Sequence, residues 1–62
     1  MDEYKISAAV EACLRIAERT DDKLAAKTAF LQQLAAEPGW NEADLEMVNR
    51  WVRYVLEREA GV

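Results

Sequence analysis

The dipeptide Pro38-Gly39 constrains the fold of this chain most, because it is the one clear interruption in a sequence of helix-forming residues. Proline lacks a backbone donor, and it restricts the residue before it, here Glu37, to extended conformations. A glycine that directly follows proline favours a turn. Ala, Leu, Glu, Lys and Arg are frequent on both sides. We therefore predict helices on either side of a turn at this dipeptide.

The segment before this turn begins with a helix that we expect to run over residues 5–19. Its apolar side chains recur at helical spacing, which predicts one buried stripe. The stripe consists of Ile6, Ala9, Val10, Cys13, Ile16 and Ala17. Leu14 lies outside it, and Glu11 and Arg15 form a favourable i,i+4 pair on the opposite face.

A second helix is predicted over residues 21–36. The apolar rhythm lapses at Thr20-Asp21-Asp22, and a hydroxyl followed by two acids is typical of a new helix start. The expected inner stripe is Leu24, Thr28, Leu31 and Ala35, flanked by Phe30 and Leu34. The alternative is one continuous helix through Thr20, because this segment has only a modest propensity cost.

A third helix is predicted over residues 42–59. Asn41 is a good N-cap, and Trp40 and Leu45 have the spacing of a hydrophobic staple across it. The face expected to close the core is Leu45, Val48, Val52, Val55 and Leu56. The chain is thus predicted to be all-α, a small three-helix bundle that forms a single domain over residues 1–62.

A wide apolar arc on the third helix provides the candidate partner-binding residues. Met47, Trp51 and Tyr54 follow one another at i, i+4 and i+7 and extend the arc to roughly 200°, beyond the ~100° that a surface helix needs. The predicted contact residues are Met47, Arg50, Trp51, Tyr54 and Arg58. Two alanine-rich helices lying close enough to bury this arc are the alternative. We favour an exposed contact because a chain of 62 residues buries little surface.

Catalytic, metal and cofactor sites are not expected. The chain has no histidine and one cysteine, Cys13, so an activated thiol and a zinc ligand set are both disfavoured. Neighbouring acids on a helix diverge instead of converging in a cleft, which argues against general acid-base work. We predict that the protein is not an enzyme.

Charge and cysteine content restrict the partners and the location. Eight basic and twelve acidic residues give a net charge of -4, and the basic residues form no run that would neutralise phosphates. Nucleic acid is therefore disfavoured as a partner. A single cysteine and the lack of a long apolar segment favour the cytoplasm and exclude a membrane partner.

Two functions fit this sequence. The first is a small acidic adaptor, inhibitor or regulator that binds another protein through its third helix. The second is a structural homodimer, in which the same apolar arc meets its symmetry mate and completes a bundle that is marginal alone.

Overall fold

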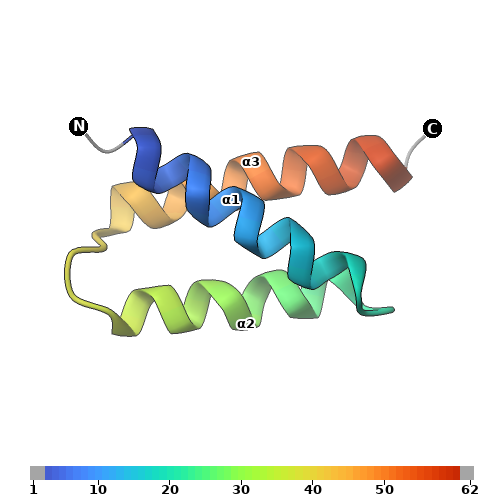
Figure 1. Ribbon diagram of the computed structural model, residues 1–62, viewed down its shortest axis with the longest axis horizontal. Helices are drawn as coiled ribbons and strands as arrows, with labels where there is room; N and C mark the ends of the chain where they lie inside the picture. Colours follow the sequence, from blue (N-terminus) through green and yellow to red (C-terminus); the bar gives the residue numbers. More distant parts are fainter. Residues whose placement is uncertain (1–2, 61–62) are drawn as a thin grey trace.

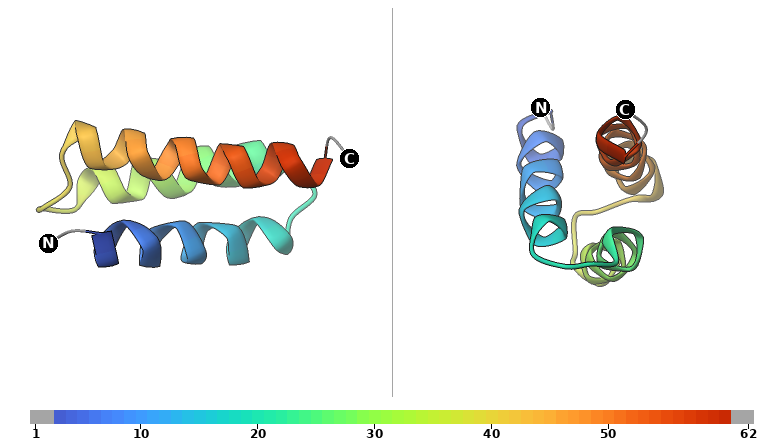
Figure 2. Two further views of the ribbon diagram at one scale, coloured as in Figure 1. Left: turned by 90° about the horizontal axis from the view of Figure 1, so that it is seen from above. Right: turned by 90° about the vertical axis from the view of Figure 1, so that its right-hand side faces the viewer.

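Three α-helices joined by two short turns make up the part of the chain described by a computed structural model, residues 3–60. They are α1 (Glu3–Glu18), α2 (Lys23–Ala36) and α3 (Glu42–Ala60). α1 and α3 run in the same direction, and α2 runs back against both (Figure 1). Seen end-on, the helices stand at the corners of a triangle (Figure 2), and each packs on the other two. The predicted all-α three-helix bundle is confirmed.

The first turn is built around Asp22, which caps α2. Its carboxylate accepts a hydrogen bond of 3.0 Å from the backbone N–H of Ala25, and the Thr20 hydroxyl accepts one of 3.1 Å from the backbone N–H of Asp22. These bonds satisfy amide donors that a helix start leaves free. The alternative of one continuous helix is therefore wrong, and α2 begins two residues later than residue 21, the predicted start.

The second turn follows from Pro38-Gly39, as predicted. Glu37 is extended and its backbone N–H closes α2 by donating to the carbonyl of Leu34. Gly39 has a φ of 95°, in the left-handed region that favours glycine. Asn41 then caps α3, because its side-chain oxygen accepts a 2.8 Å hydrogen bond from the backbone N–H of Asp44.

The core lies along the centre of the three-helix bundle and consists mostly of small and medium-sized side chains. Its buried members are Ile6, Ala9, Cys13, Ala17, Leu34, Val48, Val52 and Leu56. The predicted inner face of α3 is confirmed, since Leu45 and Val55 are partly buried beside the three buried α3 residues. On α1 two predictions are wrong: Ile16 is half exposed, whereas Leu14 packs against the core. Small residues on α1 let the helices approach closely.

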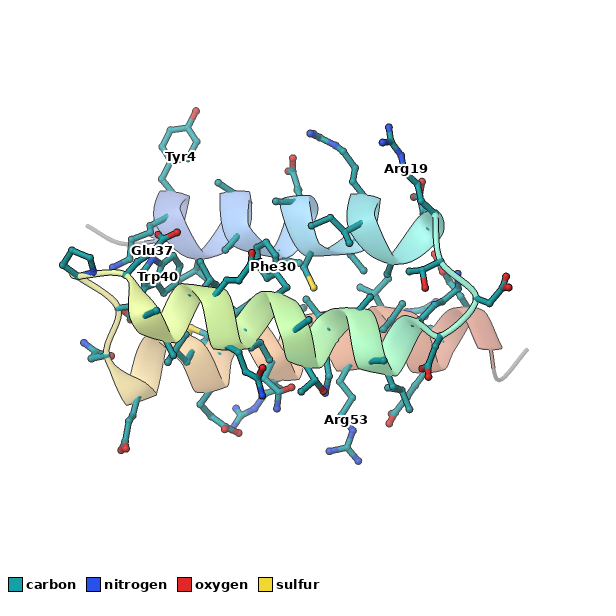
Figure 3. The ribbon with its side chains drawn as sticks, turned by 90° about the horizontal axis from the view of Figure 1, so that it is seen from below. Tyr4, Arg19, Phe30, Glu37, Trp40 and Arg53 are labelled. Atoms are coloured by element: carbon teal, nitrogen blue, oxygen red, sulfur yellow. The ribbon has the colours of Figure 1, made fainter. Side chains whose placement is uncertain are left out.

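The predicted inner face of α2 is only partly right: Leu31 packs against the core as expected, but the buried face is centred about a quarter of a helical turn away. Leu24 is 61% exposed and Leu34, expected only as a flank, is 8% exposed and is the one buried residue of the helix. Phe30 and Leu31 pack beside Leu34 against the core, and Phe30 lies on the side of α2 that faces α1 (Figure 3). Alanines occur around much of the surface of α2 itself, so its apolar pattern hardly distinguishes one face. The larger apolar side chains therefore decide which face is buried.

Candidate protein-binding site

Three large apolar side chains of α3 remain half exposed in the bundle. Met47 is 49% exposed, Trp51 52% and Tyr54 50%. The rings of Trp51 and Tyr54 meet edge to face, with centroids 6.1 Å apart and an interplanar angle of 84°. α1 and α2 therefore leave about half of each side chain uncovered. We call the predicted contact residues together the α3 patch; they are Met47, Arg50, Trp51, Tyr54 and Arg58.

Arg58 holds the tyrosine of the patch in place. Its Nη1 donates a hydrogen bond of 3.1 Å to the Tyr54 hydroxyl, and its guanidinium carbon lies 5.7 Å from the centre of the Tyr54 ring. A guanidinium over an aromatic face is attracted by the negative charge of that face. Trp51, Tyr54 and Arg58 thus form a connected row, and ordering such a row before binding lowers the entropy cost of association.

A groove between α1 and α3 opens beside this row. Its volume is about 630 Å³, which is in the range of sites that accept a side chain or a small ligand. We call it the α1–α3 groove; it is lined by Ile6, Ser7, Val10, Glu11, Asp44, Met47 and Trp51. Its floor is mainly apolar, and its two acids lie on opposite walls.

Lys5 organises one end of the groove. Its ammonium donates a 2.7 Å hydrogen bond to the carbonyl of Gly39, lies 3.2 Å from a carboxylate oxygen of Asp44, and sits 4.5 Å from the centre of the Trp40 ring. The ion pair balances the negative charge of Asp44. The ammonium of Lys5 also covers one face of the partly buried Trp40 indole. This end of the groove is therefore a fixed polar junction between α1 and the Pro38-Gly39 turn.

The five predicted contact residues do not all lie in one hollow. Met47 and Trp51 line the α1–α3 groove, whereas Tyr54 and Arg58 lie further along α3. Arg50 does not line the groove. Arg50 and Tyr54 line a separate shallow hollow of about 270 Å³, together with Glu46, Asn49, Arg53 and Glu57. The patch thus covers the outward-facing side of α3. The apolar α1–α3 groove lies on one side of the patch, and a charged surface lies on the other.

Sequence reasoning missed the α1 wall of the groove. Ile6 and Val10 were assigned to the core stripe and Glu11 to the outer face, and Ser7 was not assigned to either. The missing information was the rotation of α1 against α3, which depends on how the helices pack. The one available signal was the position of Val10 at the edge of its stripe.

Other chemistry in the described residues is sparse. Burial raises the pKa of the Cys13 thiol above its ordinary value of 9.0, and the positive charge of Lys27 offsets part of that rise. Within residues 3–60, histidine, cysteine and acidic side chains form no group of three or more that is placed to hold a metal ion. In the same stretch, none of the helices combines the length and apolar character needed to cross a membrane.

Comparison of the chain with models of known protein families, with curated proteins and with solved structures finds no match. The case for a function therefore depends on the surface of this chain alone. The part of that surface with the most residues suited to binding a protein is the α3 patch beside the α1–α3 groove.

Proposed function

We propose that this protein is a small acidic interaction module that acts by binding another protein or a second copy of itself through α3. In this role it is an adaptor, inhibitor or regulator without catalytic activity, and the α3 patch supplies the contact residues. Its location is the cytoplasm, in keeping with its single cysteine, Cys13, which is buried and reduced in the bundle.

The observation that carries this proposal is the half-exposed Trp51 and Tyr54 pair. Tryptophan, tyrosine and arginine are the residue types that most often dominate binding energy at protein interfaces. Here all three stand in one row, because Arg58 bonds to Tyr54 and Tyr54 packs on Trp51. Exposed apolar clusters of this kind mark contact sites, whereas single exposed apolar residues need no explanation.

The experiment compares the wild type with the double variant Trp51→Ala/Tyr54→Ala in affinity capture from cells that make the protein. Tyr4→Ala is the matched control, because Tyr4 is an exposed aromatic residue that points away from α2 and α3 (Figure 3). The wild type and the control should retain one specific protein, which the double variant loses at least about tenfold. Binding is then measured by calorimetry with the purified partner.

Folding has to be measured on the same three proteins. The double variant should lose less folding free energy than binding free energy, since both rings are half exposed. If the double variant loses as much folding free energy as binding free energy, the rings belong to the core and the proposal is wrong. Equal capture by all three proteins would also contradict it, provided that self-association is likewise unaffected.

A further inference from the structure

The surface between α1 and α3 continues past the groove towards the C-terminal ends of both helices. A second, smaller hollow of about 50 Å³ lies there, lined by Leu14, Ala17, Glu18, Lys23, Leu56 and Glu59. Four α1 residues of the groove and this hollow recur at i, i+4, i+7 and i+11, so they share one edge of the helix. They are Ser7, Glu11, Leu14 and Glu18. We call the residues that line the groove and the second hollow together the α1–α3 face.

Acids outnumber bases on this face. Its charged members are Glu11, Glu18, Asp44, Glu59 and Lys23. The charge of Asp44 is balanced by Lys5 at 3.2 Å. The ammonium of Lys23 donates a hydrogen bond of 3.1 Å to the carbonyl of Ala17, which holds this cation at the end of α1. Three glutamates therefore determine the charge that the rest of the face presents.

These three glutamates are exposed and poorly balanced. The cation contact of Glu11 is Arg15 at 3.9 Å, the outer limit of an ion pair, and an exposed pair of this kind contributes little. Glu18 and Glu59 make no ion pair within residues 3–60. Arg58, the neighbour of Glu59, donates instead to the Tyr54 hydroxyl. The α1–α3 face thus combines an apolar centre with uncompensated acids on both helices.

We infer that the α1–α3 face binds a basic amphipathic helix of another protein. Apolar side chains of that helix meet Val10, Met47 and Trp51, and its lysines or arginines meet the glutamates. This inference rests on the proposed function and names the class of its partner. Glu11 and Glu18 are seven residues apart on α1, which is about 10 Å along the helix. Two basic residues at the same interval on a helix that runs along α1 therefore reach both acids.

Shape and charge both favour this occupant. A channel between two helices that run in the same direction suits a further helix, which packs its apolar side chains into the channel and adds to the bundle. The regular elements of residues 3–60 are all helices, so an extended peptide has no strand edge there to pair with. A second copy docked by the same face would bring acid against acid, because both edges carry glutamates.

The test begins with a selection of helical peptides. The probe is a displayed library of helices of about 18 residues, with apolar residues along one face and lysine, glutamine or glutamate in equal shares at the flanking positions. Panning on the wild type should enrich lysine over glutamate at least ~threefold at those positions, because only lysine complements the acidic edges. The tightest peptide is then synthesised, and its affinity is measured by fluorescence anisotropy.

The double variant Glu11→Gln/Glu18→Gln removes the α1 charges and keeps the shape of the face. It should bind the selected peptide ~tenfold more weakly, and Trp51→Ala should weaken binding at least as much. The matched control Glu37→Gln/Glu46→Gln removes the same number of charges outside the face and should stay within ~twofold of the wild type. Thermal unfolding should be alike in both double variants, because all four glutamates are exposed.

Three results would overturn the inference. One is a selection that yields no binder or shows no preference for lysine. Another is a selected peptide whose affinity is unaffected by Glu11→Gln/Glu18→Gln. The third is a wild type that dimerises through Trp51, because a second copy would then cover the face.

Failure of the proposed function looks different, because it requires that Trp51→Ala/Tyr54→Ala leave every association unchanged. A captured protein that depends on Trp51 and Tyr54, together with neutral or acidic helices from the selection, keeps the proposed function and excludes a basic helix as the partner.

Discussion

Lys27 on α2 donates a hydrogen bond of 2.7 Å from its ammonium to the side-chain oxygen of Asn49 on α3. Both side chains are partly buried. Lys27 also lies close enough to Cys13 for its charge to influence the thiol. A cation at the junction of the helices is thus stabilised by a neutral amide and not by an acid. Such a bond fixes how α2 and α3 sit against each other without an ion pair.

The Lys27–Asn49 bond should be measurable as a coupling energy. In a double-mutant cycle of Lys27→Met and Asn49→Ala, we expect a coupling of about 1 kcal/mol in the free energy of unfolding, because one partner is charged and both are only partly buried. Urea denaturation of the four proteins measures it. A coupling near zero would show that the bond contributes nothing to the packing of α2 on α3.

Leu34 and Leu24 offer a matched pair on α2. Leu34→Ala removes the one buried side chain of the helix and should cost about 2–4 kcal/mol. Leu24→Ala should change stability by less than about 0.5 kcal/mol, because Leu24 is mostly exposed. Chemical denaturation compares them. Equal losses would mean that α2 presents the face expected from its sequence and not the face seen here.

Stability should fall at alkaline pH in part because of Cys13. Since burial raises the pKa of the folded-state thiol above its ordinary value of 9.0, the unfolded chain loses its thiol proton first as the pH rises. The contribution of the protonated Cys13 thiol to stability is complete below pH 9.0. It is lost progressively as the pH rises towards the higher folded-state pKa. The measured quantity is the difference in the pH dependence of stability between the wild type and Cys13→Ala, which should have the flatter profile.

The two tryptophans should differ in their access to solvent. Trp51 is half exposed, whereas Trp40 is partly buried and covered on one face by Lys5. In dilute samples, acrylamide should quench the fluorescence of Trp40→Phe, which keeps Trp51, more strongly than that of Trp51→Phe. When the α3 patch is covered by a bound protein or by a second copy, quenching of Trp51 should decrease. A Trp51 signal that stays the same when the protein binds its partner would oppose a contact through α3.

Local signals in the sequence were enough to predict the helices. Asn41 and Asp22 cap helices because their short polar side chains reach backbone donors within three residues. Pro38 and Gly39 act on their own backbone and their neighbours. The inner face of α3 was equally predictable, since large apolar and charged residues there lie on opposite sides. None of these effects requires knowledge of distant contacts.

The faces of α1 and α2 were less predictable. Ile16 and Leu24 have the apolar character of core residues, yet both are exposed because the neighbouring helices pack elsewhere. Alanine fits either a buried or an exposed position at little cost, so helices rich in it carry a weak pattern. The position of Lys27 against Asn49 depends in the same way on the partner helix.

The sequence by itself determined three helices, the Asn41 cap and the shared face of Met47, Trp51 and Tyr54, because spacing along one helix decides which residues share a face. Tertiary structure alone decided that Ile6, Val10 and Glu11 line a groove together with Met47 and Trp51. The physical reason is that the rotation of one helix against another depends on the close packing of many side chains at once.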